Sequence, residues 1–253
     1  MNQSVIKALK LLNYFTEEKR ELTLKEITEK AGIPKPTVYR LLRSLEYCGF
    51  LMKTNGHEQD EKYRLGLKLM ELGNLVSDQL EIRKIAKPYM ERLAQEINEA
   101  VHLVIAHDNQ AIYIEKVDSS RALRLYTRIG KSSPLFIGSG PKLLLAFMEK
   151  DKQEVVLSQN NLESLVDHQP IAKEDLLCEL KDIRKKGYSM STGEQDIDTT
   201  GISYPVWNHH KQVAAALAVS GLSSHFEGEN LENIKRKTAE TALAISRGLG
   251  FQP

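Results

Sequence analysis

The sequence lacks the residues that several common classes of protein need. It has only two cysteines in 253 residues, Cys48 and Cys178, too few and too far apart for a disulfide framework or a zinc cluster. No apolar run approaches the roughly 18 residues that span a membrane, and residues 2–10 lack the apolar core of a secretion signal. These absences lead us to expect a soluble, cytoplasmic protein with two reduced thiols and no membrane partner.

Motifs for catalysis and for nucleotide phosphates are also missing. There is no Gly-x-Ser-x-Gly elbow and no Walker spacing, and Gly138-x-Gly140 lacks the third glycine of a dinucleotide fingerprint. His102 lies within a strand pattern, which favours a core or sheet-face residue. His209 and His210 lie on an expected turn without nearby carboxylates, which is weak support for a metal site. We therefore predict no catalytic residue, no metal and no cofactor. The alternative is a small-acid enzyme with an accessory DNA-binding domain.

Charge is balanced over the whole chain but not along it. The formal net charge is +1, so no overall field attracts nucleic acid. Residues 1–66 hold twelve Lys and Arg against nine Asp and Glu, an excess of three, and residues 30–45 hold four basic residues and no acidic one. A local patch of this kind is sufficient for contacts with phosphates.

Residues 22–51 are typical of two short helices joined by a tight turn. Apolar residues recur at helical spacing in 24–31 and again in 38–45. Thr23 and Glu26 form a capping-box pattern, and Gly32 ends the first helix. The second helix carries the following residues off its apolar stripe: Lys35, Pro36, Thr37, Tyr39, Arg40, Arg43 and Ser44. A basic outer face on the second helix indicates a helix-turn-helix that enters the major groove. The alternative is an ordinary amphipathic hairpin with a solvated face.

A strand hairpin is expected to follow these helices. Residues 49–52 and 62–65 have strand patterns, and Asn55-Gly56 between them is a strong hairpin turn signal. Helix, helix and hairpin predict a winged helix-turn-helix, in which Arg64 on the wing contacts the DNA backbone. An N-terminal helix within residues 4–15 is expected to pack behind the other two, with a buried face of Val5, Ile6, Leu9 and Leu12.

The rest of the chain predicts an α+β domain. Residues 67–80 form a helical segment that is more apolar than a flexible linker, so we expect it to pack against a second domain or a partner subunit. Strands are expected at 100–106, 111–117, 122–128, 188–190, 202–207 and 212–219, and helices at 86–97, 141–149, 152–159, 172–186 and 230–248. Strand hairpins combined with helices indicate a mainly antiparallel sheet with helices on it.

A glycine-rich loop is the most informative stretch of this second part. Gly138, Ser139 and Gly140 lead into a helix at Pro141, and proline fits the first turn of a helix. Free N–H groups at a helix start attract an anion, and glycines let a ligand approach closely. A small carboxylate would suit this loop. The alternative is a plain loop and helix start.

Residues 4–250 resemble the IclR family of bacterial transcription regulators, because motifs of that family occur in the same order along this chain. The resembling positions of the first part are residues 4–9, Leu11, Leu12, Phe15, 22–24, Ala31, Gly32, 36–42, 49–51 and 63–66. Those of the second part are Pro134, Leu135, Gly138, Lys142, 144–146, 183–188, Gly193, Glu194, Pro205, Val206 and 214–221. The chain departs from the family at Phe136, where His is frequent, and at Pro141 and Asp198, where Gly is common. The departure at Asp198 leaves the local loop path open.

The resemblance implies a winged helix-turn-helix at 1–66, a linker helix at 67–81 and a GAF-like effector-binding domain at 82–253. By position, the residues of the effector pocket are Gly138, Ser139, Gly140, Glu194, Asp196 and Ser220. Two of them have simpler alternatives: Glu194 as a solvated residue or a partner of Arg184, and Ser220 as the end of a strand.

The combined prediction is a ligand-responsive transcriptional regulator. We expect a repressor, and the alternative is an activator, since the resembling family contains both. Its partners would be a palindromic operator in double-stranded DNA and a small-molecule effector, an organic acid. It would act as a homodimer or a dimer of dimers (a homotetramer).

Overall fold

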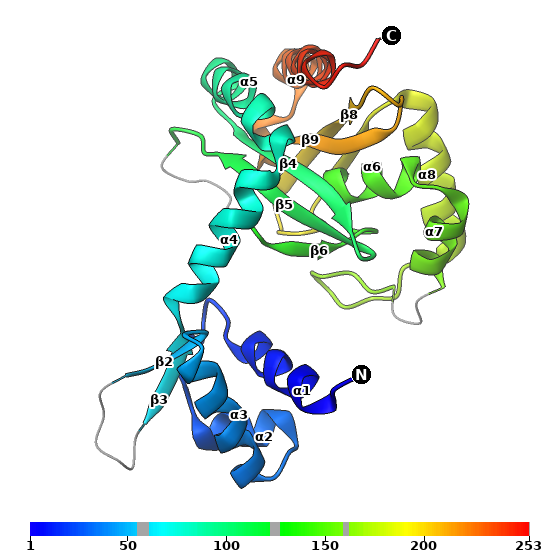
Figure 1. Cartoon of the computed structure of the whole chain (residues 1–253). Helices are drawn as coiled ribbons and strands as arrows, with labels where there is room; N and C mark the ends of the chain where they lie inside the picture. Colours follow the sequence, from blue (N-terminus) through cyan, green and yellow to red (C-terminus); the bar gives the residue numbers. More distant parts are fainter. Residues whose placement is uncertain (55–60, 122–126, 159–161, 253) are drawn as a thin grey trace. The chain divides into compact units, whose positions relative to one another are not determined.

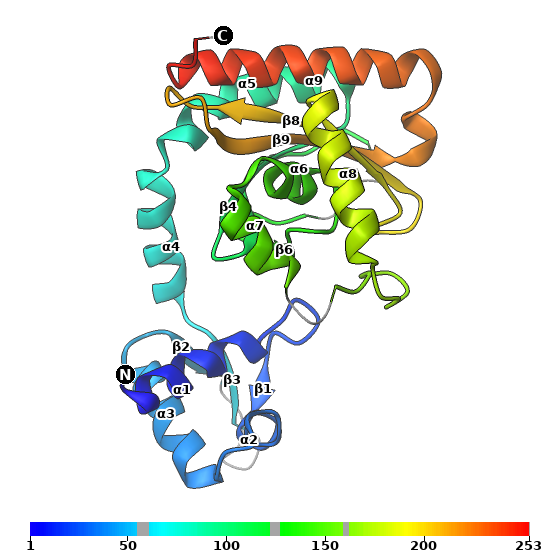
Figure 2. The ribbon, with the colours of Figure 1, turned by 90° about the vertical axis from the view of Figure 1, so that its right-hand side faces the viewer.

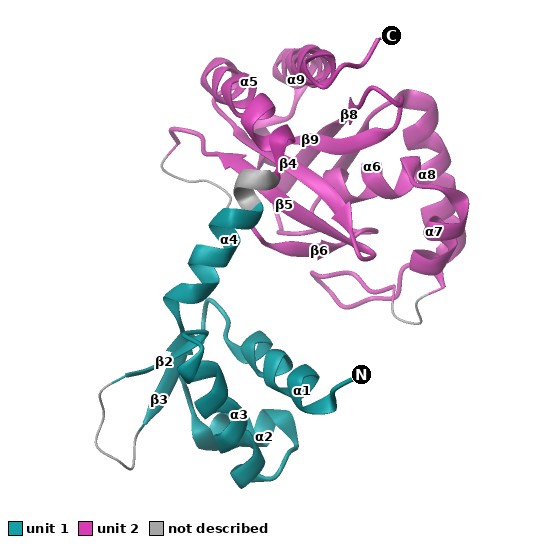
Figure 3. Ribbon diagram, in the orientation of Figure 1, with its two compact units in different colours: residues 1–79 teal, residues 80–253 magenta. Residues whose placement is uncertain are grey.

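The computed structural model describes residues 1–54, 61–121, 127–158 and 162–252. The chain divides into unit 1, Met1–Gln79, and unit 2, Leu80–Pro253 (Figure 3). The expected turn at Asn55-Gly56 and most of the expected strand at 122–128 lie outside the described residues. Among the described helices, none is long and apolar enough to cross a membrane.

Unit 1 combines helices with a small antiparallel sheet (Figure 1). Its helices are α1 (Gln3–Leu11), α2 (Leu24–Ala31), α3 (Lys35–Tyr47) and α4 (Leu67–Gln79), with a 3₁₀ turn at Leu12–Tyr14. Its strands, in the spatial order β1-β3-β2, are β1 (Leu22–Thr23), β3 (Lys62–Leu65) and β2 (Leu51–Thr54). The α2–α3 pair followed by the β2–β3 hairpin is the arrangement expected of a winged helix-turn-helix.

The buried face of α1 differs from the prediction. Val5 and Leu9 are 53% and 50% exposed, whereas Leu11 is buried and packs with Val38 and Leu42 of α3. Apolar residues cover more than half the circumference of this helix, so two overlapping stripes satisfy the helical period. Packing against α3 selects the stripe that contains Leu11.

The start of α2 is fixed by the capping box that its sequence predicts. The Glu26 N–H donates to Thr23 Oγ1 at 3.2 Å, and the Thr23 N–H donates to Glu26 Oε2 at 2.8 Å. Lys19 adds an ion pair to the same carboxylate at 2.8 Å. These bonds, from Lys19 first and then from Thr23, lower the pKa of Glu26 to about 2.

Replacing Glu26 by alanine is expected to lower the free energy of unfolding of unit 1 at pH 7 by about 1 kcal/mol, as for the loss of a helix cap. A lowered carboxyl pKa stabilises the folded state above the ordinary pKa of 4.5, and that contribution disappears as pH falls through about 2. The difference between wild type and Glu26→Ala should therefore close between pH 4.5 and 2. Urea unfolding at several pH values measures it, with exposed Glu29→Ala on the same helix as control. A pH-independent difference would contradict the argument.

Unit 2 is built on a six-stranded antiparallel sheet in the order β6-β5-β4-β9-β8-β7. In chain order the strands are β4 (Ala100–His107), β5 (Gln110–Val117), β6 (Ser132–Pro134), β7 (Ser189–Thr192), β8 (Thr199–Trp207) and β9 (Val213–Leu222). The helices are α5 (Glu81–Ile97), α6 (Ser139–Phe147), α7 (Lys150–Leu157), α8 (Lys173–Lys186) and α9 (Gly228–Gly248). The expected α+β architecture with an antiparallel sheet is confirmed.

The sheet has an apolar core on each face. Helices α5 and α9 lie side by side on one face, and α6 and α8 cover the other (Figures 1 and 2). Side chains alternate along the strands accordingly: Val101 and Leu103 of β4 belong to the core with α5 and α9, whereas Val104 belongs to the core with α6. Residues of β4 that point toward α6 therefore face the loop at residues 138–140.

Several boundaries differ from the sequence predictions. Helix α5 begins at Glu81 rather than at residue 86, which places Pro88 inside the helix. Helix α6 begins at Ser139, two residues before Pro141. The two-residue β1 and three-residue β6 were not predicted, since such short strands carry no periodic pattern.

Candidate functional site

The outer face of α3 is exposed as the amphipathic pattern requires. Val38, Leu42 and Leu45 are buried, which turns the opposite side of the helix outward. Of the residues predicted to contact DNA, Lys35, Pro36, Tyr39, Arg40, Arg43, Ser44 and the wing residue Arg64 are exposed, and Thr37 is half-buried. The helix is preceded by Gly32 in the left-handed conformation, φ 61°, so the turn between α2 and α3 is tight.

Polar contacts on this face leave Arg40 available to a ligand. Arg43 donates to Tyr39 Oη at 3.5 Å and lies 3.9 Å from Glu46. The Ser44 hydroxyl donates back to the Arg40 carbonyl oxygen at 3.1 Å. The Arg40 guanidinium forms no ion pair with any other described residue. A free guanidinium on an exposed helix face can bind a phosphate or the acceptor edge of guanine.

In unit 2, the structure brings all six predicted effector residues around one small cavity of about 40 Å³. Gly138, Ser139 and Gly140 come from the start of α6, and Glu194 and Asp196 from the loop between β7 and β8. Ser220 comes from β9. The cavity is lined by polar side chains and by the first turn of a helix. At this volume it has room for only a few water molecules, so a larger ligand requires its lining side chains to move.

The anion site expected at the start of α6 holds a carboxylate of the chain itself. Gly138, with φ 87°, is the N-cap of α6, and its N–H donates to Glu194 Oε2 at 2.8 Å. Glu194 Oε1 lies 2.5 Å from the ammonium of Lys142, which also pairs with Glu179. The Lys142 side chain is only 3% exposed. Glu194 therefore pairs with Lys142 rather than Arg184, and it links the β7–β8 loop to α6.

Nine further residues that line this cavity were not predicted, and two of them bear on its chemistry. Gln195 and His102 both line it. His102 is 1% exposed, and neither ring nitrogen has a hydrogen-bond partner among the described residues. Burial lowers the pKa of His102 to about 4, so its ring is neutral at pH 7. For His102, the signal in the sequence is a polar residue within the apolar run of β4, a pattern that favours a core or sheet-face residue.

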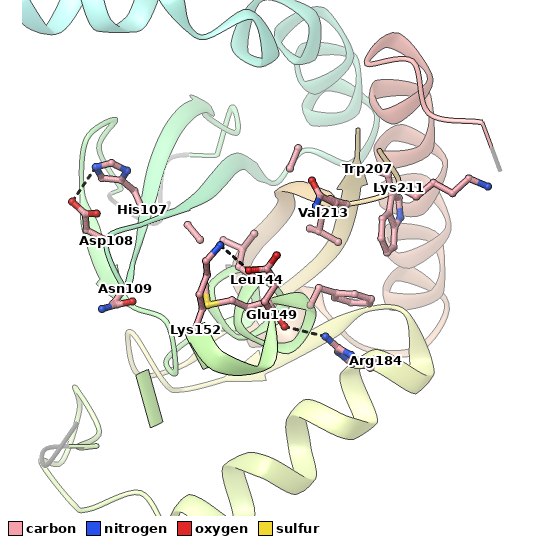
Figure 4. Close-up of a pocket in the computed structure, with 15 residues that line it drawn as sticks. His107, Asp108, Asn109, Leu144, Glu149, Lys152, Arg184, Trp207, Lys211 and Val213 are labelled. Atoms are coloured by element: carbon pink, nitrogen blue, oxygen red, sulfur yellow. Dashed lines mark hydrogen bonds and ion pairs between the residues drawn. The ribbon is translucent and has the colours of Figure 1, made fainter. Parts of the chain in front are cut away.

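A larger hollow of about 880 Å³ lies elsewhere in unit 2. Figure 4 shows it between His107, Asp108 and Asn109 on one side and Trp207 and Lys211 on the other. None of the six predicted effector residues lines it. Two pairs of its polar side chains already contact each other, Lys152 with Glu149 at 2.9 Å and His107 with Asp108 at 3.3 Å. We favour the smaller cavity as the functional site because it contains a helix start and a buried histidine that has no hydrogen-bond partner among the described residues.

Comparison with known proteins identifies both parts of the chain. Residues 4–54 match the model of the IclR helix-turn-helix domain, and residues 75–247 match that of the C-terminal domain of the bacterial transcriptional regulator IclR. The chain belongs to the IclR family. It is an IclR-family transcriptional regulator, and the expected resemblance is confirmed.

Relatives within the IclR family align over nearly the whole chain. The HTH-type transcriptional regulator KipR of Bacillus subtilis is 39% identical over 99% of this chain and 98% of its own length. XynR of Escherichia coli, another HTH-type transcriptional regulator, is 31% identical over 98% of both chains. The fold agrees with that of an IclR transcriptional regulator from Alicyclobacillus acidocaldarius, at a TM-score of 0.81 and 26% identity over 98% of both chains.

Proposed function

We propose that this chain is a transcriptional repressor that binds an operator in double-stranded DNA and releases it in response to a small carboxylic acid. Residues 1–66 would bind DNA, residues 67–81 would form the linker helix and residues 82–253 would bind the effector. Among the relatives, YiaJ of E. coli is named a DNA-binding transcriptional repressor and is 29% identical over 99% of this chain. Repression is thus the activity most directly suggested by a relative's name.

The observation that carries the DNA-binding part is the exposed basic face of α3. Arg40 and Arg43 would contact bases or phosphates, and Lys35, Pro36, Thr37, Tyr39 and Ser44 would position the helix in the major groove. Arg64 on the wing would contact the DNA backbone. A dimer or a dimer of dimers would place pairs of these helices on one face of a palindromic operator, about 34 Å apart or a multiple of that distance.

The effector would bind in the cavity at the start of α6. Ser139 and Gly140 supply N–H groups in the first turn of α6. Among the described residues, neither N–H donates to an acceptor. Such groups, aligned with the helix dipole, stabilise an anion. Because Glu194 already accepts from Gly138, an incoming carboxylate would bind beside it, and the β7–β8 loop would adjust. The effector would bind without chemical turnover.

Replacing Arg40 by alanine is expected to weaken operator binding by about 1–3 kcal/mol if the guanidinium reads a guanine, and to relax specificity at that base pair. Fluorescence anisotropy on the native upstream DNA and on random duplex measures both effects at one fixed salt concentration. Arg92→Ala, an exposed arginine on α5 in unit 2, is the matched control and should bind as wild type does. Unchanged binding by Arg40→Ala to both duplexes would remove Arg40 from the interface.

The proposal as a whole is tested by gel shift on the chain's own upstream region. The wild-type protein should retain this DNA, and a small carboxylic acid should release it. Absence of retention at low salt, with and without acids, would contradict the DNA-binding assignment. Retention that no acid changes would contradict only the effector assignment.

A further inference from the structure

The side chain of Gln195 fills the space next to the proposed effector cavity. Its Nε2 lies 3.1 Å from Tyr113 Oη, 3.3 Å from the Ile137 carbonyl oxygen and 3.4 Å from Ser133 Oγ. The Tyr113 hydroxyl also lies 3.2 Å from Gln195 Oε1. One carboxamide thus contacts polar groups of two segments, at residue 113 in β5 and at residues 133 and 137 in β6 and the loop before α6.

The neighbours of this carboxamide require a hydrogen-bond donor. A backbone carbonyl can only accept, so the atom beside Ile137 must be the amide nitrogen. Burial raises the pKa of Tyr113, so its hydroxyl stays protonated at pH 7. For the Ile137 carbonyl, no other donor is recorded among the described residues. A molecule that displaces Gln195 must supply a hydrogen-bond donor, an N–H or an O–H group, or leave a buried acceptor unpaired. A carboxamide supplies this donor on the same group that it replaces.

Gly138 leaves the room that the carboxamide occupies. A Cβ built on Gly138 would lie 2.5 Å from Gln195 Nε2, closer than non-bonded atoms approach. Gly138 also has φ 87°, a conformation that glycine adopts without strain. Because Gly138 has no side chain, the Gln195 carboxamide can lie against the start of α6.

Other groups that line the cavity can donate hydrogen bonds. The N–H groups of Ser139 and Gly140 begin α6. His102, buried and without a partner in the described part of the chain, lines the same space. The neutral imidazole carries one N–H and one acceptor nitrogen. A carboxylate bound here would accept hydrogen bonds from α6 and from His102.

We propose that the Gln195 carboxamide occupies the place of part of the effector, and that the effector is a small carboxylic acid that also carries an N–H donor such as a carboxamide. Its carboxylate binds between Ser139, Gly140 and His102, and its N–H group takes over the contact with the Ile137 carbonyl. This inference rests on the proposed effector site in unit 2.

Matched pairs of acids test the need for the N–H group. Succinamate and levulinate differ only by NH₂ against CH₃ at the same carbonyl carbon, and glutaramate and 5-oxohexanoate repeat the comparison with one more CH₂. Isothermal titration calorimetry on the full chain measures their dissociation constants. The carboxamide of at least one pair is expected to bind tenfold or more tightly than its ketone, since the ketone leaves the Ile137 carbonyl unpaired.

Replacing Gln195 by alanine tests whether its carboxamide occupies the place of part of the effector. Gln195→Ala is expected to bind the better carboxamide about fivefold to tenfold more tightly, because the ligand no longer has to displace a bound side chain. Gln153→Ala is the matched control: Gln153 in α7 donates one hydrogen bond to the Leu145 carbonyl, and it does not line the cavity. This variant should bind as wild type does. Circular dichroism at the assay temperature checks that both variants are folded.

The outcomes separate this inference from the proposed function. Equal binding of a carboxamide and its ketone overturns the N–H requirement and leaves the effector site in place. Absence of binding by all four acids to wild type and to Gln195→Ala overturns the inference. Gel shifts on the same preparations judge DNA binding independently. Should Gln195→Ala not fold, the comparison of paired acids on wild type still decides the ligand class.

Discussion

Replacing Leu42 by alanine is expected to lower the free energy of unfolding of unit 1 by about 3–4 kcal/mol. Leu42 is fully buried in α3 and packs in the core that also contains Leu11, Ile27 and Val38. The substitution removes apolar contacts and leaves a cavity, because neighbouring side chains collapse only partly. A domain typically has a total stability of about 5–15 kcal/mol, so the loss is a large fraction.

The chain offers an internal way to measure this effect unit by unit. Its single tryptophan, Trp207, lies in β8 of unit 2, so tryptophan fluorescence follows unit 2 while circular dichroism follows both units. Circular dichroism should show that unit 1 of Leu42→Ala unfolds at a lower urea concentration than unit 1 of the wild type. The fluorescence transition of unit 2 should stay unchanged. Operator binding should be lost at a correspondingly lower temperature.

Leu9→Ala is the matched control for Leu42→Ala. Leu9 is 50% exposed on α1, so its truncation should cost less than about 1 kcal/mol. If Leu42→Ala unfolded no more easily than Leu9→Ala, the core assignment of α3 would be wrong. If the fluorescence transition moved with it, the two units would not unfold separately.

Replacing Lys142 by methionine is expected to destabilise unit 2 by about 2–3 kcal/mol. The buried ammonium lies between Glu179 and Glu194, and methionine keeps an unbranched side chain as far as Cε but lacks the charged nitrogen. Removing one partner of a fully buried ion pair costs about 3–5 kcal/mol. The two glutamates are 39% and 32% exposed, so water screens them and reduces the loss.

A double-mutant cycle distinguishes the charge from packing. Adding Glu194→Gln to Lys142→Met should restore part of the stability, because one of the two uncompensated carboxylates becomes neutral. Urea unfolding followed by Trp207 fluorescence measures all four proteins. Lys152→Met, whose ammonium is 66% exposed beside Glu149, is the control and should change stability by less than about 0.5 kcal/mol. Additive losses in the cycle would exclude coupling between Lys142 and Glu194.

The sequence predicted the local structure of unit 1 well where residues near in the chain decide it. The capping box of α2, the left-handed Gly32 and the strand Lys62–Leu65 follow from pairs or short runs of residues. The prediction was wrong where the sequence of an element is compatible with more than one buried face. The apolar residues of α1 fit two stripes, and only contact with α3 selects the one with Leu11. Strands β1 and β6 exist because a neighbouring strand pairs with them.

The residues of the candidate cavity also fall into two groups, those that neighbouring residues in the chain predict and those that they do not. Gly138, Ser139 and Gly140 were predicted from a glycine-rich loop before a helix, a signal contained in adjacent residues. Glu194, Asp196 and Ser220 were placed by family resemblance. Gln195 and His102 were missed as site residues because nothing in their own surroundings in the chain marks them. Gln195 reaches Tyr113 across 82 positions of sequence, a separation over which no periodic pattern extends.

By itself, the sequence determined the family, from motifs in order along residues 4–250. It also determined the order of the longer helices and strands and the basic outer face of α3, since these depend on residue types at spacings within one helix, strand or loop. Only the tertiary structure decided which groups meet across the sheet of unit 2. It placed the Glu194 carboxylate on the Gly138 N–H and the Lys142 ammonium between two glutamates. It also placed the His102 ring in a polar cavity, where no other described residue forms a hydrogen bond with it. Such contacts depend on the packing of strands and helices far apart in the chain, because short-range hydrogen bonds and burial act in space and not along the sequence.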